Sequence, residues 1–432
     1  MTTYLERVDL FIQAEGLDAA GLPVDLILSD FRAEMEAGLA GRASSLAMIP
    51  TYISVDVPVP PYKPVIALDA GGTHLRIAQV EFDESGNADI SHFSRHRMPG
   101  SEGELAREAF FARFVELLQP LVHPPARIGF CFSYPAEISP ARDGRLLTWT
   151  KEIKAPQVEG EYIGRRILQG LENLGRGVSF TLLNDTVAAL LAGKCARIDQ
   201  AFESYVGFIL GTGTNSAYVE KQARILKKAG LDPLGSQAVN VESGNFDLCP
   251  RTRFDKGLDA ATNNPGAYRF EKMISGAYLG RLCLRVLKAA ARADLFSRDA
   301  QAVILNLARL STIQVDKFME NSLDRSPLAS SALVRQDRET ILLLLEAVIA
   351  RAACLSAVNI ASAVLKSGAG RSKARPVCVN IEGSTYYGVQ GLQSQTEAYL
   401  KQILLKHGRH AQLVRIPDSS LIGAAVAGLT QA

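Results

Sequence analysis

The chain has 432 residues, 47% of them hydrophobic, which is enough for two or three globular domains with filled cores. Lysine and arginine number 47 against 45 acidic residues, and this near balance, without a basic stripe, argues against a nucleic-acid partner. The six cysteines lie far apart without a CxxC pair, and no run of about eighteen apolar residues occurs, so we expect a cytoplasmic protein with no membrane partner.

The first segment, Met1 to Gly38, has helical spacing of its apolar residues. Charged side chains between Met1 and Leu17 exclude a signal-peptide core. We predict two helices that are broken near Gly21-Leu22-Pro23. The proline-rich run Val57 to Pro61 is a stiff lead into the next element.

A β-hairpin is predicted from Pro64 to Phe82. Two apolar runs, Val65 to Leu68 and Leu75 to Val80, flank a turn that contains Asp69, Gly71, Gly72 and Thr73. Glycines permit positive φ and bring backbone N–H groups close to an anion, while the aspartate offers a carboxylate for a hydrated cation. The turn therefore suits a phosphate and metal cradle, although many Gly-Gly turns bind nothing.

A second hairpin of the same kind follows later in the chain. The apolar run Tyr205 to Leu210 enters Gly211-Thr212-Gly213-Thr214, and Asn215 to Glu220 leads back out. Two hairpins with Gly/Thr tips suggest two parts of the protein that face each other and hold a ligand between them.

The remaining segments repeat one order of elements. After the first hairpin we expect strands at 90–98, 127–132 and 178–183, with helices at 102–118, 160–174 and 186–196. After the second we expect strands at 238–242, 376–381 and 412–416, and helices at 268–291, 339–365, 391–404 and 421–429. A duplicated unit predicts two similar α/β domains facing a cleft, with ligand groups at the strand ends.

Asp185 is the first candidate for chemistry, because it follows a buried strand at the start of a helix. Capping that helix is the equally plausible alternative. Thr148-Trp149-Thr150-Lys151 contains the single tryptophan, and by itself this pattern favours a surface loop anchored by one aromatic residue over a functional loop. Glu242 and Glu271 lie near element ends, where acids often only cap.

With these residues in place, the chain resembles the hexokinase family within the actin-like ATPase fold. The similarity runs through nearly the whole chain in ordered motifs: Ser44-Ser45-Leu46 to Pro50-Thr51-Tyr52, Leu68-Asp69-Ala70-Gly71-Gly72-Thr73 to Arg76, Phe132-Ser133-Tyr134-Pro135, Trp149-Thr150-Lys151, Leu183-Asn184-Asp185-Thr186-Val187, Gly211-Thr212-Gly213-Thr214-Asn215, and Phe270-Glu271-Lys272-Met273-Ile274-Ser275-Gly276 with Tyr278-Leu279-Gly280.

The resemblance implies a role for each matching residue. Asp185 would be the general base for the sugar 6-hydroxyl, and Lys151 would neutralise the phosphoryl group in flight. The sugar hydroxyls would be held by Ser133, Thr150, Lys151, Asn184, Asp185, Asn215, Glu242 and Glu271. The ATP phosphates and nucleotide would be held by Asp69, Gly71, Gly72, Thr73, Arg76, Gly211, Thr212, Gly213, Gly383 and Ser384, with Asp69 also holding Mg²⁺ through water.

The implied fold is α/β: two duplicated actin-like ATPase (ribonuclease H-like) domains facing a cleft, with helical insertions. The small domain would comprise 63–184 and 419–432, and the large domain 1–62 and 185–418. The implied activity is ATP-dependent hexokinase action on glucose or a related hexose, by a monomer or homodimer. A catalytically silent sugar sensor and an actin-like ATPase are the alternatives.

Four positions depart from the family pattern. His74 replaces the usual asparagine, Ser243 and Asn245 replace the usual tryptophan and alanine after Glu242, and Glu382 replaces an aspartate. None of them is the implied base, so they bear on sugar preference and nucleotide affinity.

Overall fold

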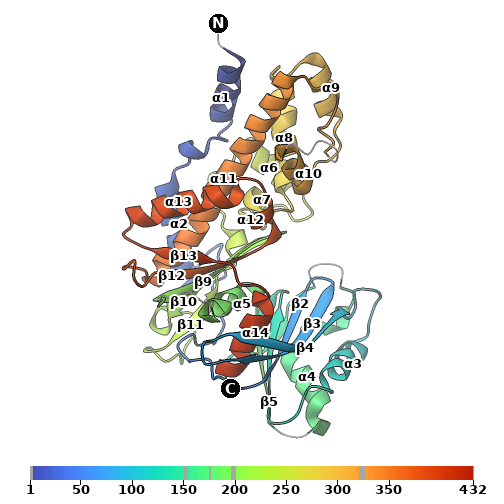
Figure 1. Ribbon diagram of the computed structural model, residues 1–432, viewed down its shortest axis with the longest axis vertical. Coiled ribbons are helices and arrows are strands. Elements are labelled where there is room, and N and C mark those ends of the chain that lie inside the picture. Colours follow the sequence, from blue (N-terminus) through green and yellow to red (C-terminus); the bar gives the residue numbers. More distant parts are fainter. Residues whose placement is uncertain (1–2, 150–152, 175–176, 196–200, 321–325, 432) are drawn as a thin grey trace.

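The protein is described from a computed structural model, which covers residues 3–149, 153–174, 177–195, 201–320 and 326–431. Its strands form a five-stranded sheet, a six-stranded sheet and a two-stranded hairpin (Figure 1). The strands are β1 (Ile49–Pro50), β2 (Val65–Gly71), β3 (His74–Phe82), β4 (Ala88–Arg97), β5 (Ala126–Phe132), β6 (Ala136–Ile138), β7 (Gly144–Leu146), β8 (Val178–Leu183), β9 (Ser204–Leu210), β10 (Thr214–Lys221), β11 (Ser236–Asn240), β12 (Val377–Glu382) and β13 (Ala411–Val414).

The two large sheets have the same topology. The five-stranded sheet has the order β4-β3-β2-β5-β8, and the six-stranded sheet has β11-β10-β9-β12-β13 with β1 added beside β11. In each sheet, three neighbouring strands alternate in direction, each antiparallel to the next. The remaining two strands run parallel to the one of these three that comes first in the chain, β2 or β9. The predicted duplication is therefore confirmed, and the ends of β2 and β9 carry equivalent hairpin tips.

More helices accompany the six-stranded sheet than the five-stranded sheet. They are α1 (Tyr4–Ala14), α2 (Val24–Leu39), α3 (Arg107–Leu118), α4 (Ile163–Leu171), α5 (Asp185–Ala192), α6 (Arg253–Ala260), α7 (Glu271–Ile274), α8 (Leu279–Arg292), α9 (Arg298–Asn306), α10 (Thr312–Met319), α11 (Arg335–Ser367), α12 (Ser384–Gly388), α13 (Leu392–Lys406) and α14 (Ser419–Thr430). We call the five-stranded sheet with α3, α4 and α14 the small lobe, and the six-stranded sheet with the other helices the large lobe.

Helices α5 and α14 lie side by side between the two sheets (Figure 1). Their apolar residues share one core cluster with strands of both lobes, including Ala67 of β2 and Ala217 of β10. Glycine allows the close packing, because a Cβ at Gly423 of α14 would lie 2.0 Å from the carbonyl oxygen of Ala188 in α5. The two helices therefore pack together where the two lobes meet.

The long helix α11 fills the core of the large lobe, where it packs against α2, α8, α13 and the sheet. It is long and apolar enough to cross a membrane by length and composition, although most of its apolar stretch is buried inside the lobe. The expectation of no such apolar run therefore needs correction. Its charged Arg351 is buried and paired with buried Asp255 at 2.7 Å, which satisfies both charges inside the core.

One predicted helix is wrong. The segment 268–291 is not continuous but contains α7 and α8, which are separated by residues 275–278. The break is held by long-range bonds, since the amides of Gly276 and Ala277 donate to the carbonyls of Gly211 (2.9 Å) and Thr212 (3.2 Å). The domain boundaries at 63, 184 and 419 remain a prediction.

Candidate active site

A cleft of about 970 Å³ separates the two lobes. Both hairpin tips line it, together with the end of β8 and the start of α5. Of the residues predicted from the sequence, the structure brings these together at the cleft: Gly71, Gly72, Thr73, Ser133, Asn184, Asp185, Thr212, Gly213, Asn215, Glu242 and Glu271.

The first tip is a tight turn at Gly72 and Thr73. Only Gly72 has positive φ (79°), so it alone requires glycine for its backbone conformation; the expectation for Gly71 is not met. Tyr134 fixes the turn, because its hydroxyl donates to the carbonyl of Gly72 at 2.6 Å. The tip is therefore rigidly attached to the small lobe.

The second tip needs glycine for a different reason. A Cβ at Gly213 would lie only 2.5 Å from Oε2 of Glu271. The same oxygen accepts the amide of Thr214 at 3.0 Å, which anchors the carboxylate against the tip. Glycine at position 213 therefore makes room for an acid that the sequence assigns to the sugar.

Gly383 and Ser384 lie against this second tip rather than within the cleft lining. Gly383 has a φ of 125°, and a Cβ on it would lie 2.1 Å from the carbonyl oxygen of Leu210. The hydroxyl of Thr385 donates to the carbonyl of Gly211 at 2.8 Å. This close approach places the start of α12 beside the tip, so the two segments predicted to hold the nucleotide are adjacent.

Asp185 occupies the first turn of α5, and it lines the cleft. The N-cap is Asn184, whose Oδ1 accepts the amide of Thr186 at 2.9 Å. Asp185 Oδ1 accepts the same amide at 2.8 Å. Asp185 therefore caps the helix start and also lines the cleft, so the capping and cleft-facing interpretations are compatible.

Glu242 is held by two asparagines. Asn240 Nδ2 donates to Glu242 Oε1 at 2.8 Å and Asn215 Nδ2 donates to Asn240 Oδ1 at 2.8 Å. Burial raises the pKa of Glu242, and the nearby charge of Asp185 adds to this effect. Burial likewise raises the pKa of Glu271, with a contribution from Glu242. The two acids thus lie in one desolvated polar wall.

Asp69 and Arg76 form a second polar group beside the first tip, outside the cleft lining. Arg76 Nη2 lies 2.6 Å from Asp69 Oδ2, and the same guanidinium bonds Asp418 (2.9 Å) and Ser420 (2.7 Å) at the start of α14. Arg76 therefore ties the first hairpin to the helix between the lobes.

Glu382 lies close to this group and hydrogen bonds with Ser419. Burial raises its pKa, and Asp185 and Asp69 raise it further. Several carboxylates thus share the region, yet across the described ranges no three His, Cys, Asp or Glu side chains are close enough to hold a metal by themselves.

Thr150 and Lys151 lie outside the described residues, so their predicted roles stay predictions. The preceding Trp149 is not a surface anchor alone, because its ring packs 4.9 Å from that of Tyr134 and 5.5 Å from that of Phe110. Its indole N–H donates to the carbonyl of Ala155 at 2.8 Å. The loop is therefore anchored in the small-lobe core immediately before the predicted ligands.

The polar residues of the cleft that sequence reasoning did not select include Thr214, Asn240 and Tyr268. Asparagine is depleted in strands, so Asn240 at the end of a buried strand was a usable signal. Tyr268 lies three residues before Glu271, and the sequence around it has no pattern that marks it as a site residue.

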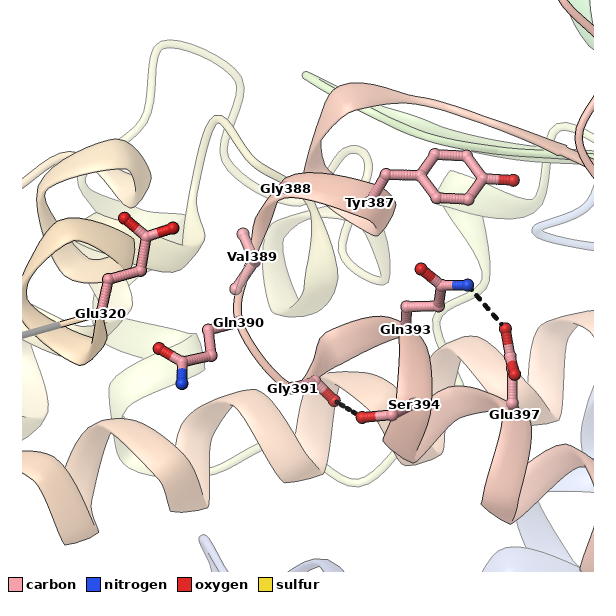
Figure 2. A pocket seen from close by; sticks show the side chains of 9 residues that line it. All are labelled: Glu320, Tyr387, Gly388, Val389, Gln390, Gly391, Gln393, Ser394 and Glu397. Atoms are coloured by element: carbon pink, nitrogen blue, oxygen red, sulfur yellow. Dashed lines mark hydrogen bonds between the residues drawn. The ribbon is translucent and has the colours of Figure 1, made fainter.

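A second pocket, of about 610 Å³, lies where the chain passes from α12 into α13. Figure 2 shows its lining, with Gln393 bonded to Glu397 and Ser394 bonded to Gly391. None of the site residues predicted from the sequence lines it. The predicted site residues therefore gather at the cleft and not at this pocket.

Comparisons with known proteins agree with this geometry. The family models described as hexokinase match residues 21–195 and 205–430. Hexokinase-1 of Schizosaccharomyces pombe is 29% identical, covering 95% of this chain and 89% of that protein. Hexokinase-7 of Oryza sativa subsp. japonica is 30% identical, covering 93% and 92%.

The fold agrees with solved structures as well. A hexokinase from Schistosoma mansoni complexed with glucose superposes with a TM-score of 0.74 at 24% identity, covering 99% of both chains. At that identity the superposition supports the fold, while the family models and the relatives establish the family. The chain belongs to the hexokinase family, as an ATP-dependent sugar kinase with two actin-like domains.

Proposed function

We propose that this hexokinase transfers the γ-phosphoryl group of ATP to the 6-hydroxyl of glucose or a related hexose, with Asp185 as general base. The observation that carries the proposal is the single cleft that gathers both Gly/Thr tips, Asp185 and the Glu242–Glu271 wall. Phosphoryl transfer needs mainly positioning and charge neutralisation, which such a set of groups supplies.

The reaction follows from these positions. Asp185 removes the proton from the sugar hydroxyl, whose oxygen bonds to the γ-phosphorus while the bond from that phosphorus to the ADP oxygen breaks. The sugar is held through its other hydroxyls by Glu242, Glu271, Asn215, Asn184 and Ser133. The amides of the two tips take the phosphates, and Thr150 and Lys151 complete the set.

Mg²⁺ fits beside the first tip in an outer-sphere position. One oxygen of Asp69 is bound by Arg76, and the carboxylate lies within 4 Å of the place a Cβ on Gly71 would take. Asp69 would therefore hold the ion through water, and the ion supplies neutralisation of phosphate charge. Magnesium prefers to keep several waters, which suits a site with one protein carboxylate.

We also propose the small domain as 63–184 with 419–432, the large domain as 1–62 with 185–418, a cytoplasmic location, and a monomer or homodimer. The six cysteines are all free thiols, which supports a reducing compartment.

A coupled assay of ADP release with a panel of hexoses tests the function. We expect turnover with glucose or a related hexose, and little ADP release without sugar. ADP release independent of any sugar would favour an ATPase, and sugar binding without ADP release would favour a silent sensor.

A further inference from the structure

Two departures from the family pattern, Ser243 and Asn245, have specific partners in the structure. Ser243 is fully buried, and its hydroxyl accepts Nδ2 of Asn359 in α11 at 3.0 Å. Asn245 has its partner at the cleft, since its Oδ1 accepts the backbone amide of Tyr268 at 3.3 Å. Asn245 thus restrains the backbone of Tyr268, a residue that the proposed reaction does not yet use.

Tyr268 has an unusual backbone. Its φ is 52°, in the left-handed region that bulky residues rarely adopt. Such a conformation costs free energy and persists where neighbours hold it. The bond from Asn245 is one such restraint.

The side chain of Tyr268 lines the cleft beside both sugar-holding acids. It is half-buried, and in the described part of the chain its hydroxyl has no hydrogen-bond partner. Burial raises the pKa of Tyr268, and the charges of Glu242 and Glu271 raise it further. The phenol is therefore neutral and retains a proton to donate.

We infer that Tyr268 is a specificity-determining residue, whose hydroxyl donates a hydrogen bond to the sugar hydroxyl that the Glu242–Glu271 wall accepts, and that Asn245 is its positioning residue. A carboxylate accepts the proton of a sugar hydroxyl, so the oxygen of that hydroxyl keeps a lone pair for an outside donor. Tyr268 is the donor at that place on the wall. This inference rests on the proposed sugar site.

The test compares wild type with Tyr268→Phe, which removes the hydroxyl and keeps the ring. The measurement is kcat/KM for glucose and for its 1-deoxy, 2-deoxy, 3-deoxy and 4-deoxy analogues. We expect Tyr268→Phe to lower kcat/KM for glucose about 3- to 10-fold, the range for a neutral hydrogen bond. The loss should vanish for the one analogue that lacks the contacted hydroxyl and persist for the others.

The matched control is Tyr162→Phe, in the small lobe away from the cleft, where the ring stacks under Arg165. This variant should have the same kcat/KM as wild type for all five sugars. An equal loss by Tyr268→Phe on every sugar, or no loss on any, would overturn the inference while the enzyme remained active. Absence of hexose-dependent ADP release in wild type would instead overturn the proposed function, and this inference with it.

A second variant tests the positioning residue. Asn245→Ala removes the acceptor of the Tyr268 amide, so we expect it to repeat the sugar-selective loss of Tyr268→Phe. The double variant should then lose no more than the larger single loss, because both changes remove one interaction. A uniform loss over all five sugars would show that Asn245 is only structural, and that part of the inference would fall.

Discussion

Glu271 and Gly213 are in mutual contact: the place a Cβ on Gly213 would occupy lies 2.5 Å from Glu271 Oε2. The turn between β9 and β10 thus carries the predicted phosphate-binding tip, and the absence of a side chain at Gly213 leaves room for Glu271, the proposed sugar-binding acid. The proposed sugar and nucleotide sites share this one contact.

Gly213→Ala should displace Glu271, because its anchored oxygen cannot retreat without losing the amide of Thr214. Overpacking of this kind costs about 1–3 kcal/mol, so the KM for the sugar should rise roughly 10-fold. Steady-state kinetics with varied sugar measures the change.

Gly103→Ala is the matched control for this prediction, because a Cβ at that position meets no atom within 4 Å. Its KM should equal that of wild type. An unchanged KM in Gly213→Ala would show that Glu271 does not hold the sugar in this position.

Asp185→Asn tests the base while retaining an acceptor for the Thr186 amide. We expect kcat to fall roughly 10²- to 10⁴-fold, with a far smaller change in sugar binding, as for loss of a general base. Asp185→Ala should give the same loss. Single-turnover kinetics and calorimetric sugar titration separate the two effects.

The control is Asp143→Asn, since Asp143 also serves a helix start by accepting the amides of Gly164 (2.7 Å) and Arg165 (2.8 Å). That variant should lose stability and keep kcat. If Asp185→Asn kept more than about a tenth of wild-type turnover, Asp185 would not be the base.

The sequence predicts the strand pairs well because each hairpin alternates around a short polar tip. It also places Asp185 at a strand-to-helix junction, which is where the structure has it. What the sequence could not predict depends on contacts far along the chain. The break at Gly276 is such a case, because its cause is the carbonyl of Gly211.

The candidate site shows the same difference between what local sequence patterns predict and what long-range contacts decide. Motif residues gather as expected, whereas the restraint of Tyr268 by Asn245 depends on a bond between separate loops. The pairing of Arg76 with Asp418 likewise joins positions that no local pattern connects. Residue type reveals candidate chemistry, but only the folded chain reveals which side chains hold one another.

The pH dependence follows from Glu242. Its folded pKa is raised by burial, so the folded state binds a proton more strongly than the unfolded state. Glu242 therefore makes its full contribution to folding stability at pH values below its unfolded pKa. This contribution is lost as the pH rises through its folded pKa. Glu242→Gln, which cannot ionise, should raise the melting temperature of sugar-free protein at pH 8 by about 1–3 °C.

Calorimetric melting curves from pH 5 to pH 8 measure this effect. The gain in Glu242→Gln should shrink toward low pH, because a larger fraction of wild-type Glu242 is then protonated. Its sugar KM should rise most at high pH, where the variant lacks the charged acceptor of wild type, and the rise should be smaller toward low pH. A melting temperature that fell equally at both ends of the range would contradict the raised pKa.

Closure of the two lobes has an intrinsic probe in Trp149, the single tryptophan. Its amide donates to Glu159 Oε1 at 2.8 Å and its ring packs in the small-lobe core, next to the predicted sugar ligands Thr150 and Lys151. Sugar groups from both lobes should draw the lobes together and exclude water that would hydrolyse ATP. We expect saturating glucose to change the Trp149 fluorescence and reduce the small-angle scattering radius, in wild type and in Asp185→Asn alike, because binding rather than turnover drives closure.

L-Glucose, which has the same composition and the opposite hand, is the control and should change neither signal. A glucose complex with unaltered fluorescence and an unaltered radius would show that the model of two lobes closing on the sugar is wrong for this protein.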